Sequence, residues 1–198
     1  MKERPILFSA PMVRALLAGT KTQTRRIYKN RKHPDFGCDI AASELVREQQ
    51  HVIDRACPYG QPGDRLWVKE TTVNVEDFGY LGPVWAESDH GRNTLEYGLA
   101  PSEDDCTEVE PEDLRLRPSI FMSRSMSRIT LEITAVRVER LQAISRGDAM
   151  AEGCPFPNMA QGDDPRKWYA DLWGVINGPD SWATNPWVWV VEFKAVQP

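Results

Sequence analysis

The sequence predicts an α+β fold: a small mixed β-barrel with helices packed at its rim and a long insertion, in a single domain over residues 1–198. Strand-like alternation of apolar residues occurs near both ends of the chain, and helical patterns stand between these segments. The helices do not alternate with single strands, which argues against a doubly wound parallel sheet. Residues of about 74–118 are rich in glycine, proline and acids, and we expect them to be an insertion that covers or flanks the barrel mouth.

A short strand at 4–9 and a helix after it are the first predicted elements. Ser9 can cap a helix start, and Pro11 is favoured in the first turn because it has no N–H to leave unsatisfied. Gly19 tolerates the left-handed conformation that ends many helices. The apolar residues at helical spacing are Met12, Val13, Leu16 and Leu17.

The middle of the chain has weaker patterns. Residues 42–53 predict a short helix, and 65–73 predict a strand after the turn sequence YGQPGD. Within the insertion, the segments 83–88 and 94–99 predict a hairpin.

Regular patterns of apolar residues appear again in the last third of the chain. Residues 127–141 alternate as a strand with one slip, which indicates a β-bulge. Ser145 and Asp148 have the spacing of a capping box that opens a short helix over 146–153, which Gly153 closes.

A second helix over 164–178 and a final strand over 187–196 follow. The helix is expected to bury a face that contains Trp168, Leu172 and Val175. One face of the strand contains Trp187, Trp189, Val191 and Phe193. Such tryptophans can stack nucleic-acid bases, but alternation in a small barrel favours a core role.

Composition limits the classes of protein that the chain can represent. Its 41% hydrophobic residues suffice for a core, and no apolar run reaches the ~20 residues of a membrane helix. The start of the chain does not resemble a signal peptide, so we expect a cytoplasmic protein without a membrane partner. Cys38, Cys57, Cys106 and Cys154 are scattered, which favours structural thiols and predicts neither a metal site nor a cofactor.

Charge is distributed unevenly despite the net value of −5. Residues 21–32 hold only basic charges, and residues 103–113 hold only acidic ones. A local basic patch can attract a polyanion even on an acidic protein, although two solvated surface runs are the alternative interpretation.

Lys21 and Thr24 are candidate catalytic residues at the start of the basic stretch. A lysine whose pKa is lowered can act as the base for a threonine nucleophile, and the charges of Arg25 and Arg26 would lower it. In a continuous strand the two side chains would point to opposite faces, whereas in a bend they would meet. Gly19 favours a bend in a loop, while a surface lysine beside a helix cap is the alternative.

Glu152 directly precedes Gly153, at a helix end where the dipole disfavours a carboxylate. An acid in this position suggests a cationic partner such as lysine, although an exposed glutamate would also be tolerated.

The segment LLAGTKTQTRR resembles the signature of the ASCH-domain superfamily, G-x-K-x-x-[E or T]-x-R, through Gly19, Lys21, Thr24 and Arg26. The segments QPGDRLWVKE and NPWVWVVEF are also similar to that superfamily, whose fold is a PUA-like β-barrel. The whole chain resembles the larger ASCH proteins of phages and prophages. Among small bacterial relatives it is most similar to the N4-acetylcytidine amidohydrolase family.

The resemblance implies a metal-independent amidohydrolase without a cofactor, acting on an N4-acylated cytosine in a nucleoside or in RNA. Lys21 would be the base, Thr24 the nucleophile, and Glu152 the acid that orients Lys21 or handles the proton. In a variant of this mechanism, Glu152 activates water and Thr24 positions it. Glu70 and Glu132 are rivals for the role of the acid.

Substrate binding is assigned to Gly19, Arg25, Arg26 and Glu70, with Arg26 stabilising the oxyanion or holding a phosphate. The chain departs from the small family because those relatives lack most of residues 74–127. Two other functions stay open: a non-catalytic RNA-binding module, and a ribonuclease that uses Lys21 as acid and Glu152 as base.

Overall fold

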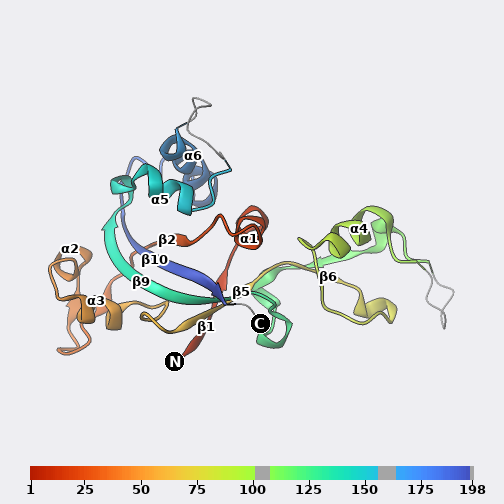
Figure 1. The fold of residues 1–198 in the computed structure, drawn as a ribbon, viewed down its shortest axis with the longest axis horizontal. Helices are drawn as coiled ribbons and strands as arrows, with labels where there is room; N and C mark the ends of the chain where they lie inside the picture. Colours follow the sequence, from red (N-terminus) through yellow and green to blue (C-terminus); the bar gives the residue numbers. More distant parts are fainter. Residues whose placement is uncertain (101–107, 156–163, 197–198) are drawn as a thin grey trace. The chain divides into compact units, whose positions relative to one another are not determined.

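The computed structural model describes residues 1–100, 108–155 and 164–196, and these form an α+β fold, as predicted (Figure 1). Cys106 lies outside the described residues. The α-helices are α1 (Ala10–Leu17), α2 (Ala42–Leu45), α3 (Gln50–Ala56), α4 (Asp89–Tyr97), α5 (Arg146–Ala151) and α6 (Pro165–Asn177). The strands are β1 (Glu3–Leu7), β2 (Gln23–Ile27), β3 (Arg31–Lys32), β4 (Asp39–Ile40), β5 (Arg65–Lys69), β6 (Thr72–Asn74), β7 (Val84–Trp85), β8 (Arg115–Arg117), β9 (Thr130–Arg140) and β10 (Trp187–Val196). The short 3-10 helices within the described residues are η1 (Glu76–Phe78), η2 (Pro111–Asp113), η3 (Ser119–Phe121), η4 (Arg124–Met126) and η5 (Leu141–Ala143).

The principal sheet has five strands in the order β1-β5-β9-β10-β2. Its longest part is the antiparallel ladder of β9, β10 and β2, in which Val190 of β10 faces Arg137 on one side and Arg25 on the other. Among the described residues the order begins with β1 and ends with β2, so hydrogen bonds do not close the sheet into the predicted barrel.

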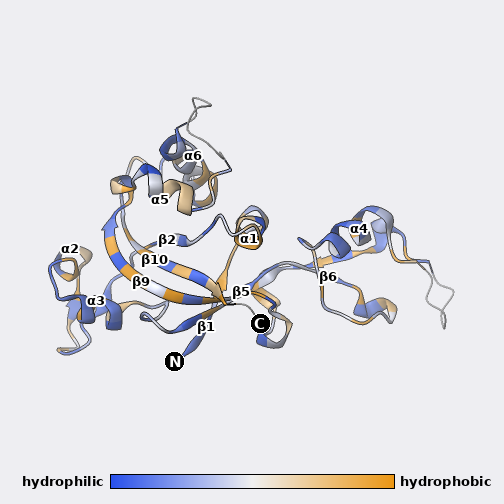
Figure 2. Cartoon of the chain, viewed as in Figure 1, coloured by the Kyte–Doolittle hydropathy of each residue, from blue (hydrophilic) through white to orange (hydrophobic). Residues whose placement is uncertain are grey.

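A β-bulge interrupts the pairing of β9 with β10. Glu192 lies opposite Ala135, whereas Phe193 lies opposite Ile133, so Thr134 of β9 has no counterpart. The bulge moves the buried positions of β9 by one residue, which explains the slip in its alternation. This prediction from the sequence is confirmed, and Figure 2 shows the alternating bands of hydropathy along β9.

The compact unit that contains most of the principal sheet comprises Met1–Arg4, Ala15–Leu66 and Thr130–Pro198. Helices α5 and α6 lie together over one side of the β9–β10 pair, while α2 and α3 lie on another (Figure 1). The cluster under α5 and α6 is fully or almost fully buried and consists of Leu141, Ile144, Ala149, Tyr169, Trp173, Val188 and Val190.

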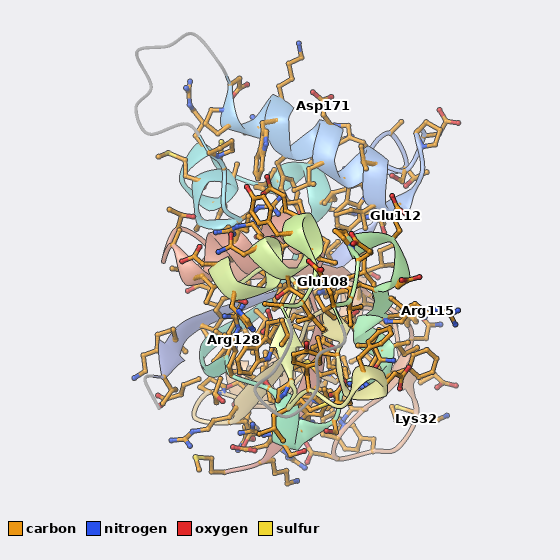
Figure 3. All side chains as sticks on the ribbon, turned by 90° about the vertical axis from the view of Figure 1, so that its right-hand side faces the viewer. Lys32, Glu108, Glu112, Arg115, Arg128 and Asp171 are labelled. Atoms are coloured by element: carbon orange, nitrogen blue, oxygen red, sulfur yellow. The ribbon has the colours of Figure 1, made fainter. Side chains whose placement is uncertain are left out.

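The buried face of α6 differs in part from the predicted one. Tyr169 and Trp173 enter the core, and Trp168 and Leu172 pack against it. Val175 is 86% exposed, because the helix turns its Tyr169–Trp173 edge toward β10, and Asp171 stands on its outer side (Figure 3). The prediction for Val175 is therefore wrong.

The final strand buries both of its faces. Val188 and Val190 belong to the cluster under α5 and α6. Trp189, Val191 and Phe193 are at most 3% exposed on the alternate positions, and the ring of Trp189 stacks on Tyr28. The core role predicted for these three residues is confirmed.

The second compact unit comprises Pro5–Arg14 and Trp67–Ile129, a wider segment than the predicted insertion. Its three-stranded sheet has the order β7-β6-β8, and the described parts of 74–118 contribute no strand to the principal sheet. The core of this unit consists of Val73, Val75, Val84, Ala86, Leu99 and Val109. Arg115 of β8 projects from its surface (Figure 3).

The predicted hairpin in this unit is wrong. Residues 94–97 belong to helix α4, whose start is capped by Ser88, since its hydroxyl accepts a hydrogen bond from the Gly91 N–H at 2.9 Å. Only β7 remains as a strand in the region where two were expected. The helix predicted over 42–53 is likewise divided into α2 and α3.

Candidate functional site

The backbone holds Lys21 between the ends of two helices. The Lys21 N–H donates to the Ala15 carbonyl of α1 at 3.1 Å, and the Thr22 N–H donates to the Ala151 carbonyl of α5 at 2.8 Å. Gly19, at φ +71°, makes the turn out of α1 that this path requires. Lys21 and Glu152 then face each other as an isolated antiparallel β-bridge.

Glu152 caps the carboxyl end of α5. The predicted capping box is present at the other end of this helix, where Ser145 and Asp148 exchange hydrogen bonds. Gly153 follows Glu152 at φ +96°, and a Cβ atom on it would lie only 2.8 Å from the Cβ of Ala15. A glycine is required here because the chain reverses in a left-handed conformation against α1.

The side chains of Lys21 and Glu152 form a buried ion pair. The Nζ atom lies 2.7 Å from Oε2 of Glu152 and 3.0 Å from its carbonyl oxygen. The two side chains are 0% and 2% exposed. Burial disfavours the ammonium form and lowers the pKa of Lys21; Glu152 opposes this, and the charges of Arg26 and Arg25 add to it.

Arg25 contacts the same carboxylate from β2. Its Nη1 donates to Oε1 of Glu152 at 3.0 Å, while Nε and Nη2 donate to Oε1 of Glu139 at 3.1 and 2.7 Å. Its guanidinium also lies 3.5 Å from Asp148 and over the ring of Tyr169. Arg25 is predicted from the sequence to bind substrate, and its side chain is 0% exposed and lies among three carboxylates.

Arg137 of β9 continues this network toward the surface. It contacts Glu139 at 3.1 Å, Asp148 at 2.8 Å and Glu192, and its side chain is one-third exposed. Burial alone would raise the pKa of Asp148, but hydrogen bonds from Ser145 and the charge of Arg25 outweigh it and lower the pKa to about 2.

Glu139 and Arg137 are part of the site but were not predicted from the sequence. A signal was present, because both occupy the polar positions of the alternating segment VRVER, which places them on one face of β9. Alternation shows that a charged face exists, but it does not show which other element covers that face.

Tyr169 of α6 completes the buried surroundings. Burial raises the pKa of its hydroxyl, and the nearby charge of Glu152 raises it further. The raised pKa keeps Tyr169 protonated and uncharged at neutral pH, and its ring packs against the guanidinium of Arg25.

Lys21 and Thr24 are not joined by a bend in a loop. Residues Gln23–Ile27 form strand β2, in which successive side chains point to opposite faces. Gln23 donates to the Asp148 carbonyl and Arg25 to Glu152, so both face α5. Thr24 therefore lies on the other face of the strand, opposite Val191, and the prediction of a bend is corrected.

Arg26 shares the strand face of Thr24 and is half-buried, opposite Trp189. Gly19 serves the backbone turn described above. The basic stretch does not form a uniform cationic surface, because Lys21 and Arg25 are buried in ion pairs and Lys32 pairs with Asp39 at 2.9 Å.

The two rival acids have other partners. Glu70, in the second compact unit, accepts hydrogen bonds from Nε and Nη2 of Arg128 at 3.0 and 2.9 Å. Arg128, labelled in Figure 3, lies over the ring of Trp85. Glu132 forms a partly exposed ion pair with Lys194 at 2.9 Å.

The described residues contain neither a metal-binding cluster nor a membrane-spanning helix. No group of three or more histidine, cysteine, aspartate or glutamate side chains is arranged to hold a metal ion among residues 1–100, 108–155 and 164–196. Over the same ranges, no helix has both the length and the apolar character needed to cross a membrane. Cys57 is a buried thiol, and burial raises its pKa to about 11.

Comparison with models of protein families, with curated protein sequences and with solved structures gave no significant match.

Proposed function

We propose that the chain is a metal-independent amidohydrolase that removes the acyl group from N4-acetylcytidine or a related N4-acylated cytosine, with a PUA-like fold of the ASCH type. The observation that carries this proposal is the buried pair of Lys21 and Glu152, with 2.7 Å between Nζ and Oε2. The residues that match the ASCH signature supply the substrate class. A lysine that is buried and has a lowered pKa is suited to take a proton near neutral pH.

In the proposed reaction, water is the nucleophile. The neutral amine of Lys21 takes one proton from a water molecule, whose oxygen attacks the acyl carbon. The resulting ammonium, held by Glu152, returns that proton to N4 as the C–N bond breaks. The products are the free exocyclic amine of cytosine and a carboxylic acid, so that one water is consumed for each amide cleaved.

Thr24 is not assigned the attack in this mechanism. Its side chain leaves β2 on the face opposite to Gln23 and Arg25, which both reach the α5 side where Glu152 lies. The water route needs Lys21 and Glu152 in contact and requires water and substrate to reach the buried Nζ atom. Substitution of Thr24 by valine, which has nearly the same shape, distinguishes the two routes.

The test is incubation of the whole protein with N4-acetylcytidine and, separately, with unmodified single-stranded RNA. We expect release of cytidine and acetate without cleavage of RNA, and we expect Thr24→Val to retain at least about one-tenth of the turnover. A loss of about 10²–10⁴-fold in Thr24→Val would move the attack to its hydroxyl. Strand cleavage would indicate a ribonuclease, and salt-sensitive retention of RNA without turnover would indicate a binding module.

A further inference from the structure

The guanidinium of Arg25 joins two carboxylates that come from different elements. Nη1 donates to Glu152 at the end of α5, whereas Nε and Nη2 both donate to Glu139 of β9. A planar group with N–H donors on separate edges can make these contacts at once, and a lysine ammonium cannot span them in the same way.

This bridge divides the oxygens of Glu152 between two cations. Oε1 accepts from Arg25 at 3.0 Å, and Oε2 accepts from Lys21 at 2.7 Å. A carboxylate held at both oxygens cannot rotate without breaking one of these charge-assisted bonds. Glu139 is fixed in turn, because its Oε2 accepts from Arg137 at 3.1 Å.

We propose that Arg25 is a positioning residue: by holding Oε1 of Glu152 it leaves Oε2 alone to orient the amine of Lys21. The catalytic part of this inference rests on the proposed function, whereas its structural part does not. Arg25 then makes no contact with substrate, although it is a neighbour of Lys21 in sequence and carries the charge expected of a phosphate ligand.

The charge of Arg25 also acts on the protonation of Lys21. Burial is the main cause of the lowered pKa of Lys21, and the positive charges of Arg26 and Arg25 contribute to it, while Glu152 opposes it. The charged and titratable groups around the pair are Glu152 and Asp148 of the α5 segment, Arg25 and Arg26 of β2, Arg137 and Glu139 of β9, Glu192 of β10 and Tyr169 of α6. Removal of Arg25 takes away a like charge and allows both oxygens of Glu152 to serve Lys21, so the pKa of Lys21 should rise.

The experiment compares Arg25→Gln with Arg137→Gln. Arg137 is the matched control because it shares Glu139 and Asp148 with Arg25 but makes no contact with Glu152. The titration of Lys21 is followed through the pH dependence of its side-chain 13Cε chemical shift in lysine-labelled protein whose near-ultraviolet circular dichroism remains native. We expect a rise of about one pH unit in Arg25→Gln and no resolved shift in Arg137→Gln.

Kinetics with N4-acetylcytidine form the second readout. A positioning role predicts that Arg25→Gln lowers kcat by about 10²-fold and leaves KM nearly unchanged, because misplacement of a reacting group is felt in the chemical step. If Arg25→Gln does not fold, Arg25→Lys replaces it, and we expect the same loss of kcat since the bridge to Glu139 is lost.

The two readouts separate the possible failures. A raised KM with unchanged kcat and an unchanged Lys21 titration would identify Arg25 as a substrate ligand and overturn the inference. Equal shifts of the Lys21 titration in Arg25→Gln and Arg137→Gln would also overturn it, since a general loss of packing would then suffice. If the wild-type protein hydrolyses no acylated cytosine, the proposed function fails, and the titration still tests the structural role of Arg25.

Discussion

Two buried glutamates in this chain have different cationic partners, and they differ in what they can do chemically. Glu70, in the unit that contains the three-stranded sheet, has both of its oxygens held by the single guanidinium of Arg128. Glu152 gives one oxygen to Lys21 and the other to Arg25. The first is a closed pair, because an arginine does not release its proton at working pH. The second contains an amine that loses its proton more readily than an ordinary lysine, because burial lowers the pKa of Lys21.

The comparison shows why burial of an acid does not by itself identify a reactive site. Glu70 is as well buried as Glu152, and it was a reasonable rival in the sequence. The difference lies in the partner, since burial lowers the pKa of Lys21, whereas an arginine keeps its proton.

Exchange of the cation in each ion pair should give the largest difference between the two pairs, and the difference should appear in turnover. Lys21→Arg keeps the positive charge but removes the proton that can be transferred, so turnover of N4-acetylcytidine should fall by about 10²–10⁴-fold. The reverse exchange, Arg128→Lys, should leave turnover within about twofold, because that pair takes no part in the proposed reaction. Both variants are to be assayed for hydrolysis and for retention of RNA at fixed salt.

An arginine at position 21 that supported full hydrolysis would exclude Lys21 as the base, and the proposed mechanism with it. Reduced hydrolysis in Arg128→Lys, with a native circular dichroism spectrum, would show that Glu70 and not only Glu152 contributes to catalysis.

Replacement of each glutamate should also change the free energy of unfolding, and here the difference between the two acids should be smaller than the difference in turnover. Glu152→Gln removes the carboxylate that the buried cations of Lys21 and Arg25 share, while Arg25 keeps Glu139, so we expect the free energy of unfolding to fall by about 3–5 kcal/mol. Glu70→Gln leaves Arg128, whose side chain is 23% exposed and can turn partly to water, and we expect a loss of about 1–3 kcal/mol. Urea unfolding of both variants measures the difference. A larger loss in Glu70→Gln would mean that the network around Lys21 contributes little to stability.

Acid should have the smallest effect, and it should act on the region around Glu152, where Asp148 lies 3.5 Å from Arg25. The pKa of Asp148 in the folded protein, about 2, lies below its ordinary value of 3.8, so the folded state favours the charged form. The stability that this carboxylate contributes is therefore present above pH 4 and is lost as pH falls from about 4 to 2. In Asp148→Asn the dependence of the unfolding midpoint on pH should be shallower in that window. An unchanged slope would show that Asp148 does not contribute to acid sensitivity.

Local features were predictable from the sequence because their causes lie within a few residues. The capping box of Ser145 and Asp148, the left-handed Gly153 and the bulge in β9 depend on neighbouring backbone groups and on the alternation of one strand. The α+β class followed from the order of such segments.

Other features were not predictable because they depend on distant partners. Segment 94–99 has a pattern compatible with a strand, yet α4 forms there since Ser88 caps it and Gly91 packs against the Trp85 carbonyl. The role of Arg25 depends on acids 114 and 127 residues away, which no local spacing can identify. Glu152 was proposed through the family resemblance, supported by its unusual place before Gly153.

The absence of a side chain at Gly153 allows the segments that carry Lys21 and Glu152 to approach each other closely. The end of α5 meets the end of α1 with no side chain between them, and a methyl group at this position would press on Ala15 and come within 3.4 Å of the Lys21 Cβ. A substitution here would act as a wedge, lifting the segment that carries Glu152 from the segment that carries Lys21 without altering any charge. Gly153 therefore controls the distance between the Lys21 amine and the Glu152 carboxylate, although it has no reactive atom of its own.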